Sequence, residues 1–262
     1  MSRPGTLWTS GDAYEPYVGR WSRLVAVELL AWLPVPPGGR WLDLGCGTGA
    51  LAEAILRDRA PASVVGVDRS EVFVRHAAAR VPARFAVADA TALPLASGCA
   101  DVVVSGLVLN FVPDPSRAAA ELARVTRAGG TVAAYVWDYA DRMQMMRYFW
   151  DAAGELDPAA RALDEAARFT LCHPDALREL FSAAGLGTVE TRPIDVPTRF
   201  RDFDDYWTPF LGGHAPAPAY ATSLSEEDRG SLRELLRARL PYAPDGSIPL
   251  VARAWAVRGT VP

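Results

Sequence analysis

The sequence contains no lysine, so all 27 basic residues among its 262 residues are arginines. Without a lysine amine, Schiff-base chemistry, attachment of pyridoxal phosphate and the phosphate-binding lysine of a P-loop are all excluded. Acidic residues slightly outnumber the arginines, which gives a formal net charge of −4, and no basic block stands out. We therefore expect no binding to nucleic acid.

Cysteine and histidine are also scarce. The 3 cysteines show no C-x-x-C spacing, which argues against a disulfide framework or a zinc site and favours a reducing, cytoplasmic location. The 3 histidines form no H-E-x-x-H motif, and no G-x-S-x-G motif occurs, so metal and serine-hydrolase chemistry have little support. No apolar run could span a bilayer and no signal-peptide pattern is present, so we expect a soluble protein that binds neither metal nor membrane.

The most informative stretch covers residues 40–51, where a short apolar run ends on Asp43 and a G-x-G-x-G loop begins at Gly45. This pattern predicts a buried parallel strand, a tight ligand-binding turn and a helix. Spacing alone leaves two ligand classes open, because with Ala50 the loop also satisfies the dinucleotide pattern G-x-G-x-x-G/A. A carboxylate at Asp43 would repel a pyrophosphate but attract the ammonium and sulfonium of S-adenosylmethionine (SAM), which is the ligand that we favour.

Acidic residues also close the next two predicted strands. Asp68 lies nineteen residues beyond Gly49, where a nucleotide-binding unit places the carboxylate that accepts the ribose hydroxyls. An aspartate that merely caps the following helix would explain the residue type but not the distance. Asp89 ends the third predicted strand and can accept from an adenine amino group, while Ala90 leaves room beside the ring.

Apolar strands alternate with amphipathic helices along the chain. The predicted strands cover residues 40–43, 62–68, 83–90, 100–111 including the exit from the strand, 131–137 and 188–196. The predicted helices cover residues 23–33, 50–56, 71–80, 173–181 and 232–240, with a further helix opened by Asp114 and Pro115. This alternation predicts an α/β fold with a doubly wound parallel sheet.

Arg20 stands among aromatic residues just before the predicted helix over residues 23–33. A guanidinium can bind a carboxylate through two hydrogen bonds, and SAM carries such a carboxylate. The alternative is that this segment only covers the sheet.

Four short motifs occur in an order that resembles class I SAM-dependent methyltransferases. They are DLGCGTG at residues 43–49, GVDRS at 66–70, DATALP at 89–94 and NFVPD at 110–114. The resemblance is greatest to the small-molecule type (methyltransferase type 11), which includes ubiquinone- and menaquinone-biosynthesis-like enzymes, and it covers roughly residues 14–137. It implies a Rossmann-like seven-stranded sheet with helical lid insertions, whose last strand, here residues 251–257, is antiparallel. It also implies SAM as the cofactor and S-adenosylhomocysteine as the product.

The resemblance assigns roles to single positions. In such enzymes the glycine loop surrounds the methionine part of SAM, Asp68 holds the ribose, Asp89 contacts adenine, and residues like Tyr17 and Arg20 close over the cofactor. The cofactor-binding set predicted here is Tyr17, Arg20, Asp43, Gly45, Cys46, Gly47, Thr48, Asp68, Arg69, Asp89, Ala90 and Ser105.

The acceptor side departs from the family pattern. Many relatives place a histidine after the fourth strand, whereas this chain has Asn110, which can orient a substrate but can hardly deprotonate one. The other candidates for a catalytic role are His173, His214 and Asp138, although a lone histidine is more often structural. Methionine and aromatic side chains in two insertions suit a flat or apolar acceptor, but at helical spacing such side chains more often form core. The substrate-binding set predicted here is Tyr14, Asn110, Trp137, Met146, Phe149, Trp150, Tyr206, Trp207 and Phe210.

The expected organisation follows from these motifs. We expect a helical cap over residues 1–38, a SAM-binding core over 39–196 and 248–262 with an insertion at 138–172, and a lid insertion over 197–247.

The predicted activity is transfer of the methyl group of SAM to a small apolar or aromatic acceptor, on oxygen or alternatively on nitrogen or carbon. Alignment of the acceptor and exclusion of water would supply the catalysis. The alternative is a SAM-binding protein that uses its pocket for cyclisation or rearrangement, or as a non-catalytic partner. A nicotinamide oxidoreductase is disfavoured by Asp43 and by Asp89 with Ala90. We expect a monomer or a homodimer.

Overall fold

The computed structural model describes residues 19–212 and 215–262. Contacts divide the chain into two compact units. The sheet unit comprises residues 22–137, 171–194 and 254–262, and the described part of the helical unit comprises residues 19–21, 138–170, 195–212 and 215–253.

A seven-stranded sheet has the strand order β3-β2-β1-β4-β5-β7-β6. The strands are β1 (Arg40–Leu44), β2 (Ser63–Asp68), β3 (Arg84–Val87), β4 (Ala100–Gly106), β5 (Thr126–Trp137), β6 (Gly187–Phe200) and β7 (Ile248–Thr260). The pairs β1–β2, β1–β4, β2–β3 and β4–β5 are parallel, whereas β7 is antiparallel to β5. The predicted doubly wound sheet with an antiparallel last strand is therefore confirmed.

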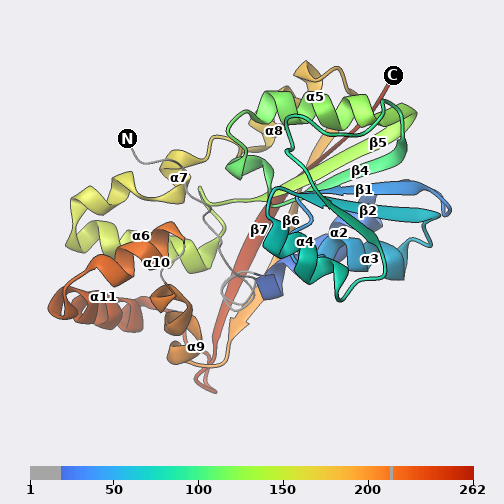
Figure 1. Ribbon diagram of the computed structural model, residues 1–262. Helices are drawn as coiled ribbons and strands as arrows, with labels where there is room; N and C mark the ends of the chain where they lie inside the picture. The colour runs from blue at the N-terminus through green and yellow to red at the C-terminus, as the bar shows by residue number, and fades with distance from the viewer. Residues whose placement is uncertain (1–18, 213–214) are drawn as a thin grey trace. The chain divides into compact units, whose positions relative to one another are not determined.

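Helices cover both faces of the sheet unit. Figure 1 shows α2, α3 and α4 on one face and α5 and α8 on the other. Their bounds are α2 (Arg20–Trp32), α3 (Ala50–Asp58), α4 (Glu71–Ala78), α5 (Pro115–Val125) and α8 (Pro174–Ala183), and a short 3-10 helix, η2 (Leu109–Phe111), follows β4. Apolar side chains from strands and helices, such as Leu42, Val103, Leu122 and Phe181, form one buried core between the layers.

Side-chain caps explain where several helices begin. The hydroxyl of Ser70 accepts the N–H of Phe73 at 3.4 Å at the start of α4. The carboxylate of Asp114 accepts the N–H of Arg117 at 2.9 Å at the start of α5, with Pro115 in the first turn. Such caps satisfy backbone donors that have no partner inside the helix.

Several element boundaries differ from the sequence-based expectation. β3 ends at Val87, and Asp89 instead forms an isolated bridge with Ala92. β6 and β7 are longer than predicted because buried and exposed side chains keep alternating beyond the expected ends. The predicted helix over residues 232–240 belongs to a longer helix that begins at Glu226, because the hydroxyl of Ser225 accepts the N–H of Asp228 at 3.1 Å.

Short helices and aromatic side chains build the helical unit. Its helices are α6 (Gln144–Leu156), η3 (Pro158–Ala162), α7 (Glu165–Arg168), α9 (Phe203–Trp207), η4 (Thr208–Leu211), α10 (Pro216–Ser223) and α11 (Glu226–Arg239). The rings of Phe149 and Phe210 stack with centroids 4.4 Å apart, and the hydroxyl of Tyr206 donates to the carbonyl oxygen of Met145 at 2.9 Å. This unit therefore has an apolar core of its own.

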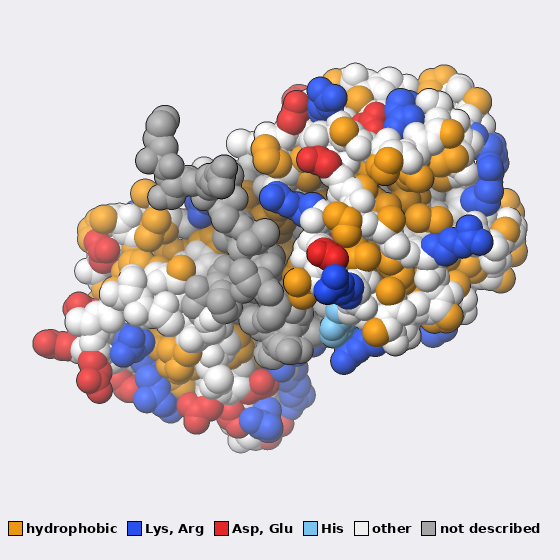
Figure 2. Space-filling model, viewed as in Figure 1, with side chains coloured by type: hydrophobic (Ala, Val, Ile, Leu, Met, Phe, Trp, Pro, Cys, Tyr) orange, Lys and Arg blue, Asp and Glu red, His pale blue; other side chains and the backbone are white. Residues whose placement is uncertain are grey.

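The surface carries charges of both signs. On the face shown in Figure 2, acidic and basic side chains are mixed over the helical unit. The first turn of α11 carries Glu226, Glu227 and Asp228 and the last turn carries Arg237 and Arg239, which matches the polarity of the helix dipole. Within the described residues, no helix is both long and apolar enough to cross a membrane.

Candidate functional site

The glycine loop between β1 and α3 has positive φ angles, which residues other than glycine adopt only at a cost in free energy. Gly45, Gly47 and Gly49 have φ angles of 71°, 51° and 91°. A Cβ added at Gly45 would lie 2.2 Å from Cγ2 of Val108, so this glycine allows the loop to pack closely on the segment after β4. A Cβ at Gly47 would meet nothing within 4 Å among the described residues, so the loop is open at this point.

Backbone hydrogen bonds and one carboxylate hold the loop. Oδ2 of Asp68 accepts the N–H of Gly47 at 3.0 Å, and Oδ1 accepts the N–H of Ser70 at 2.8 Å. Burial raises the pKa of Asp68, while the N–H groups of Ser70 and Gly47 oppose this shift. Because a carboxylate oxygen can accept more than one hydrogen bond, Asp68 retains capacity for a ligand hydroxyl beside the loop.

Asp43 is the least satisfied acidic group in this region. Its side chain is buried, and Oδ2 has no hydrogen-bond partner among the described residues. Burial, together with the nearby charge of Asp68, raises the pKa of Asp43 to about 7, while the N–H of Ala52 opposes the shift. A buried acceptor without a partner costs roughly 1–3 kcal/mol, so this oxygen marks the place where a cation or a hydrogen-bond donor fits.

Asp89, by contrast, is exposed at the surface. Its Oδ1 accepts the N–H of Thr91 at 2.8 Å and the hydroxyl of Thr91 at 2.7 Å, and these bonds lower the pKa of Asp89. Asp89 therefore stays ionised and can accept from a ligand. Ala90 is half-buried and Arg69 is exposed.

Two further residues of the predicted cofactor set contribute to the structure around the loop. The hydroxyl of Ser105 is buried and donates to the carbonyl oxygen of Leu44 at 3.0 Å, which fastens β4 to β1. Burial, with the charges of Asp43 and Asp68, raises the pKa of the Cys46 thiol. Cys46 is therefore a neutral thiol at the base of the loop.

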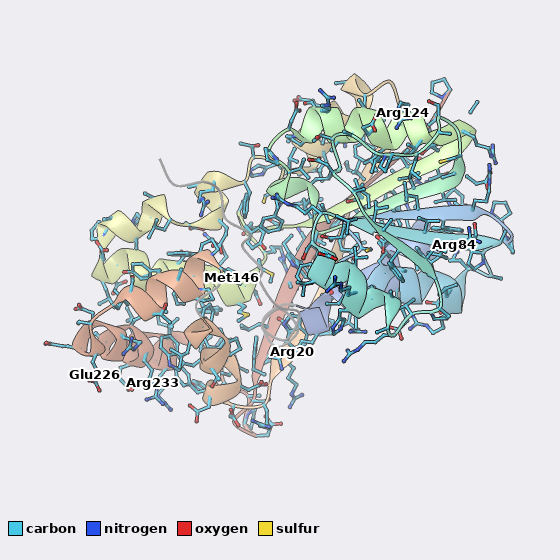
Figure 3. The ribbon with its side chains drawn as sticks, in the orientation of Figure 1. Arg20, Arg84, Arg124, Met146, Glu226 and Arg233 are labelled. Carbon is cyan, nitrogen blue, oxygen red and sulfur yellow. The ribbon has the colours of Figure 1, made fainter. Side chains whose placement is uncertain are left out.

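Arg20, labelled at the start of α2 in Figure 3, has its own partners in the helical unit. Its Nη1 donates to Oδ1 of Asp205 at 3.1 Å, and its guanidinium lies 4.3 Å from the ring centroid of Trp21 and 4.9 Å from that of Phe200. Nε and Nη2 are buried without a partner in the described part of the chain. Binding of a carboxylate by Arg20 stays a prediction.

Asn110 and His173, two of the catalytic candidates, lie in the sheet unit. Asn110 lies in η2, and its Nδ2 donates to Sγ of Cys172 at 3.5 Å. His173 is exposed and stands at the N-cap of α8 without a side-chain capping bond. Trp137, predicted to bind the acceptor, is buried at the end of β5.

Asp138, a catalytic candidate, and the remaining described residues of the predicted substrate-binding set lie in the helical unit. Oδ1 of Asp138 accepts the N–H of Asp141 at 3.0 Å, and burial raises the pKa of Asp138. The aromatic and methionine side chains of this set pack among one another and expose 5% of their surface or less; they are Met146, Phe149, Trp150, Tyr206, Trp207 and Phe210. Met146 is labelled on α6 in Figure 3. Their local role is core packing, and their contact with an acceptor stays a prediction.

Three of the predicted site residues, Tyr14, Tyr17 and His214, lie outside the described residues. Within residues 19–212 and 215–262, no group of three histidine, cysteine or acidic side chains is arranged to hold a metal ion.

Two contacts at the site escaped the sequence-based reasoning. Val108 packs against Gly45, and Cys172 accepts a hydrogen bond from Asn110. Both link segments that are distant in sequence, and valine and cysteine at these positions carry no motif. Only the folded structure shows them.

Comparison with known proteins identifies a methyltransferase domain within the sheet unit. Residues 42–134 match the family model of the methyltransferase domain. The chain is 33% identical over 180 residues to a 2-methyl-6-phytyl-1,4-hydroquinone methyltransferase of Synechocystis, covering 66% of this chain and 55% of that protein. It is 28% identical over 251 residues to an uncharacterized protein of Mycobacterium tuberculosis, covering 92% of this chain and 88% of that protein. The chain thus spans about half the length of the first of these curated relatives.

Solved structures share the fold at low sequence identity. Phosphoethanolamine N-methyltransferase 2 of Haemonchus contortus, in complex with S-adenosylhomocysteine, superposes with a TM-score of 0.62 at 17% identity, covering 98% of this chain and 59% of that chain. The [4+2]-cyclase SpnF superposes with a TM-score of 0.52 at 20% identity, covering 98% and 85%. The sheet unit, with its glycine loop and strand-end carboxylates, carries a methyltransferase domain. The matched domain, the methyltransferase relatives and the shared fold support a class I SAM-dependent methyltransferase.

Proposed function

We propose that the chain uses SAM to methylate a small-molecule acceptor. The observation that carries this proposal is the buried, unpartnered Oδ2 of Asp43 beside a glycine loop that is open at Gly47. A buried carboxylate attracts a cationic ligand and disfavours a pyrophosphate, so it selects SAM over a dinucleotide. The match of residues 42–134 to the methyltransferase domain supports the same cofactor.

When bound, SAM supplies a methyl group that is already activated by a positively charged sulfur. The residues of the chain then have to hold the donor, orient the acceptor and exclude water. We assign the first task to Asp43 and the glycine loop for the methionine part, to Asp68 for the ribose and to Asp89 for the adenine. Asn110 is assigned to the acceptor, which we propose to be small and apolar or aromatic, with oxygen favoured over nitrogen or carbon.

Calorimetric titration of the purified protein with SAM, and with NAD as the comparison, tests the cofactor. We expect micromolar binding of SAM and none of NAD. Asp68→Ala removes acceptors for two backbone N–H groups and for the ribose, so it should abolish SAM binding, whereas Asp68→Asn should leave it weakened. Binding of NAD in preference to SAM would contradict the proposal.

The transfer itself is tested by the formation of S-adenosylhomocysteine from SAM over a panel of phenols, amines and carboxylic acids. We expect S-adenosylhomocysteine to accumulate together with a methylated acceptor. SAM binding without S-adenosylhomocysteine from any acceptor would instead favour the second candidate, a SAM-binding protein that catalyses cyclisation or rearrangement. Two observations support that candidate. The residue that follows β4 at position 110 is an asparagine, whose amide cannot act as a base, and the fold is shared with a [4+2]-cyclase.

A further inference from the structure

We propose that Oδ1 of Asn110 accepts a hydrogen bond from the nucleophilic group of the acceptor, and that Cys172 is the positioning residue that holds the amide in the required orientation. The inference rests on the proposed function and deepens it, because it names the class of acceptor. That class is a neutral hydroxyl or N–H compound, as opposed to a carboxylate.

The two ends of the Asn110 amide have different environments. Nδ2 donates to Sγ of Cys172 at 3.5 Å, and the side chain of Cys172 is completely buried. Oδ1 is also buried, but it has no partner in the part of the chain that the structure describes. Buried polar atoms in folded proteins almost always have a partner, so an amide oxygen of this kind needs a donor from outside the described chain. A bound ligand can provide it.

The segment that carries Asn110 is joined directly to the glycine loop. Val108, two residues before Asn110, is the side chain on which Gly45 packs, with only 2.2 Å between Cγ2 of Val108 and a Cβ added at Gly45. Leu107 has a φ of 62°, and its N–H donates to the carbonyl oxygen of Tyr135 at 2.8 Å. A bulky residue in the left-handed region is strained, and such strain concentrates at ligand sites. Asn110 therefore follows a strained turn at the ligand-binding edge of the sheet.

The chemistry of an amide oxygen defines the acceptor. It accepts hydrogen bonds only, so a hydroxyl or N–H group can donate to it and have its lone pair oriented at the same time. An ionised carboxylate has no hydrogen to donate to Oδ1. Because an amide does not take up a proton at neutral pH, Asn110 orients the nucleophile and does not deprotonate it.

The composition of the chain makes this interaction directly observable. Asn110 is the only asparagine and Gln144 the only glutamine in the sequence. The side-chain amide region of a 15N spectrum therefore holds two NH2 pairs, which Asn110→Asp assigns by removing one of them. Gln144 lies in the helical unit, where its Oε1 accepts the N–H of Val251 at 2.6 Å, so its signal serves as an internal control.

The experiment titrates 13C,15N-labelled protein, saturated with S-adenosylhomocysteine, with phenol, anisole and benzoate. We expect phenol to shift the NH2 and 13Cγ signals of Asn110 while those of Gln144 stay unchanged. Anisole and benzoate should need at least tenfold higher concentrations for the same shift, because neither donates a hydrogen bond at neutral pH. Equal responses to the three probes, or no response to phenol, would overturn the inference.

The role of Cys172 is tested by a matched pair of variants. Cys172→Ser keeps an acceptor for Nδ2 of Asn110 and should retain the preference for phenol over anisole. Cys172→Ala removes that acceptor and should reduce the preference from at least tenfold to less than threefold. If Cys172 only fills space, both variants will lower the melting temperature and leave the preference unchanged, and this outcome would overturn the positioning role.

Calorimetry on the same samples separates this inference from the proposed function. Failure of the wild-type protein to bind S-adenosylhomocysteine would overturn the proposed function. Tight binding of S-adenosylhomocysteine without a preference for phenol would overturn only the assignment of Asn110. Each variant is compared after its own S-adenosylhomocysteine binding has shown that the cofactor site is folded.

Discussion

The two units of the molecule each bury one carboxyl group whose pKa is raised to about 7, mainly by burial. In the helical unit, Glu165 accepts a hydrogen bond from the indole N–H of Trp150, so it has a partner within its own core. In the sheet unit, Asp43 has an oxygen without a partner in the described residues and lies next to the glycine loop. Burial and a raised pKa are therefore common to the structural acid Glu165 and to Asp43, which we propose to bind the ligand. The unpartnered oxygen distinguishes them.

The largest expected difference between the two units is the loss of stability when a glycine is replaced by alanine, because the glycine loop is closely packed. Gly45→Ala places a Cβ 2.2 Å from Val108 at a φ of 71°, so we expect the free energy of unfolding to fall by about 3–5 kcal/mol. Gly212 of the helical unit has a negative φ of −78°, and its Cβ would be at an ordinary 3.5 Å from a carbonyl oxygen. Gly212→Ala should change stability by less than about 1 kcal/mol. Urea unfolding of both variants measures the contrast, and similar losses would contradict it.

Removing the two buried charges should affect SAM binding very differently. Asp43→Asn removes the charge that faces the ligand, and we expect the Kd for SAM to rise about 100-fold, since hydrogen bonds to charged groups contribute roughly 1.5–3 kcal/mol. Glu165→Gln should change the Kd less than about twofold, because Glu165 is bonded to Trp150 within its own unit. Isothermal titration calorimetry at pH 8 measures both values. Equal effects of the two variants would remove the distinction between the two acids.

In the ligand-free protein, by contrast, Glu165 should affect stability, and its ionisation should lower the free energy of unfolding. In the unfolded chain a glutamate ionises near pH 4.3, whereas Glu165 in the folded protein keeps its proton up to a pKa of about 7. Between these values the unfolded state binds fewer protons, so stability falls as the pH rises and levels off above pH 7. Glu165→Gln keeps an acceptor for the indole and should raise the free energy of unfolding at pH 8 by roughly 2 kcal/mol, with little effect at pH 4. Denaturant unfolding at both pH values checks this, and a lower stability at pH 8 would contradict it.

The smallest expected effect is the pH dependence of SAM binding. Below its pKa of about 7, Asp43 is protonated in the free protein, and a cationic ligand has to displace that proton. The Kd for SAM should therefore fall as the pH rises, by at most about tenfold, or roughly 1.4 kcal/mol, from pH 6 to 7, and change little above pH 8. Asp43→Asn should show no such dependence and is the control. Calorimetry in buffers of different ionisation enthalpy also detects the released proton, and a wild-type Kd independent of pH would contradict the role of Asp43.

Much of the sheet unit could be predicted because its signals are local. The strand that contains Asp43, the loop that begins at Gly45 and the acidic residue that ends β2 are each contained in a few consecutive residues. Apolar runs, glycines with positive φ and capping side chains act over such short distances, so they can be recognised without the fold.

The helical unit was less predictable because apolar side chains can either line a pocket or fill a core, and the sequence pattern is the same in both cases. Phe149 and Trp150 would look the same in a sequence whether they lined a pocket or filled a core, and the structure has them packed against Phe210 and Tyr220. Likewise, the contact between Asn110 and Cys172 joins positions that are 62 residues apart. Such contacts depend on how whole elements pack, which no local pattern encodes.

The sequence alone therefore determined the class of fold and the position of the glycine loop, because strand periodicity and glycine conformation act locally. The tertiary structure decided which carboxylate lacks a partner and which side chain holds Asn110, because both depend on elements brought together from distant parts of the chain. Asp43 illustrates both contributions. The sequence predicts its place near the end of a strand, but its burial and its unpartnered oxygen exist only once the sheet has formed around it.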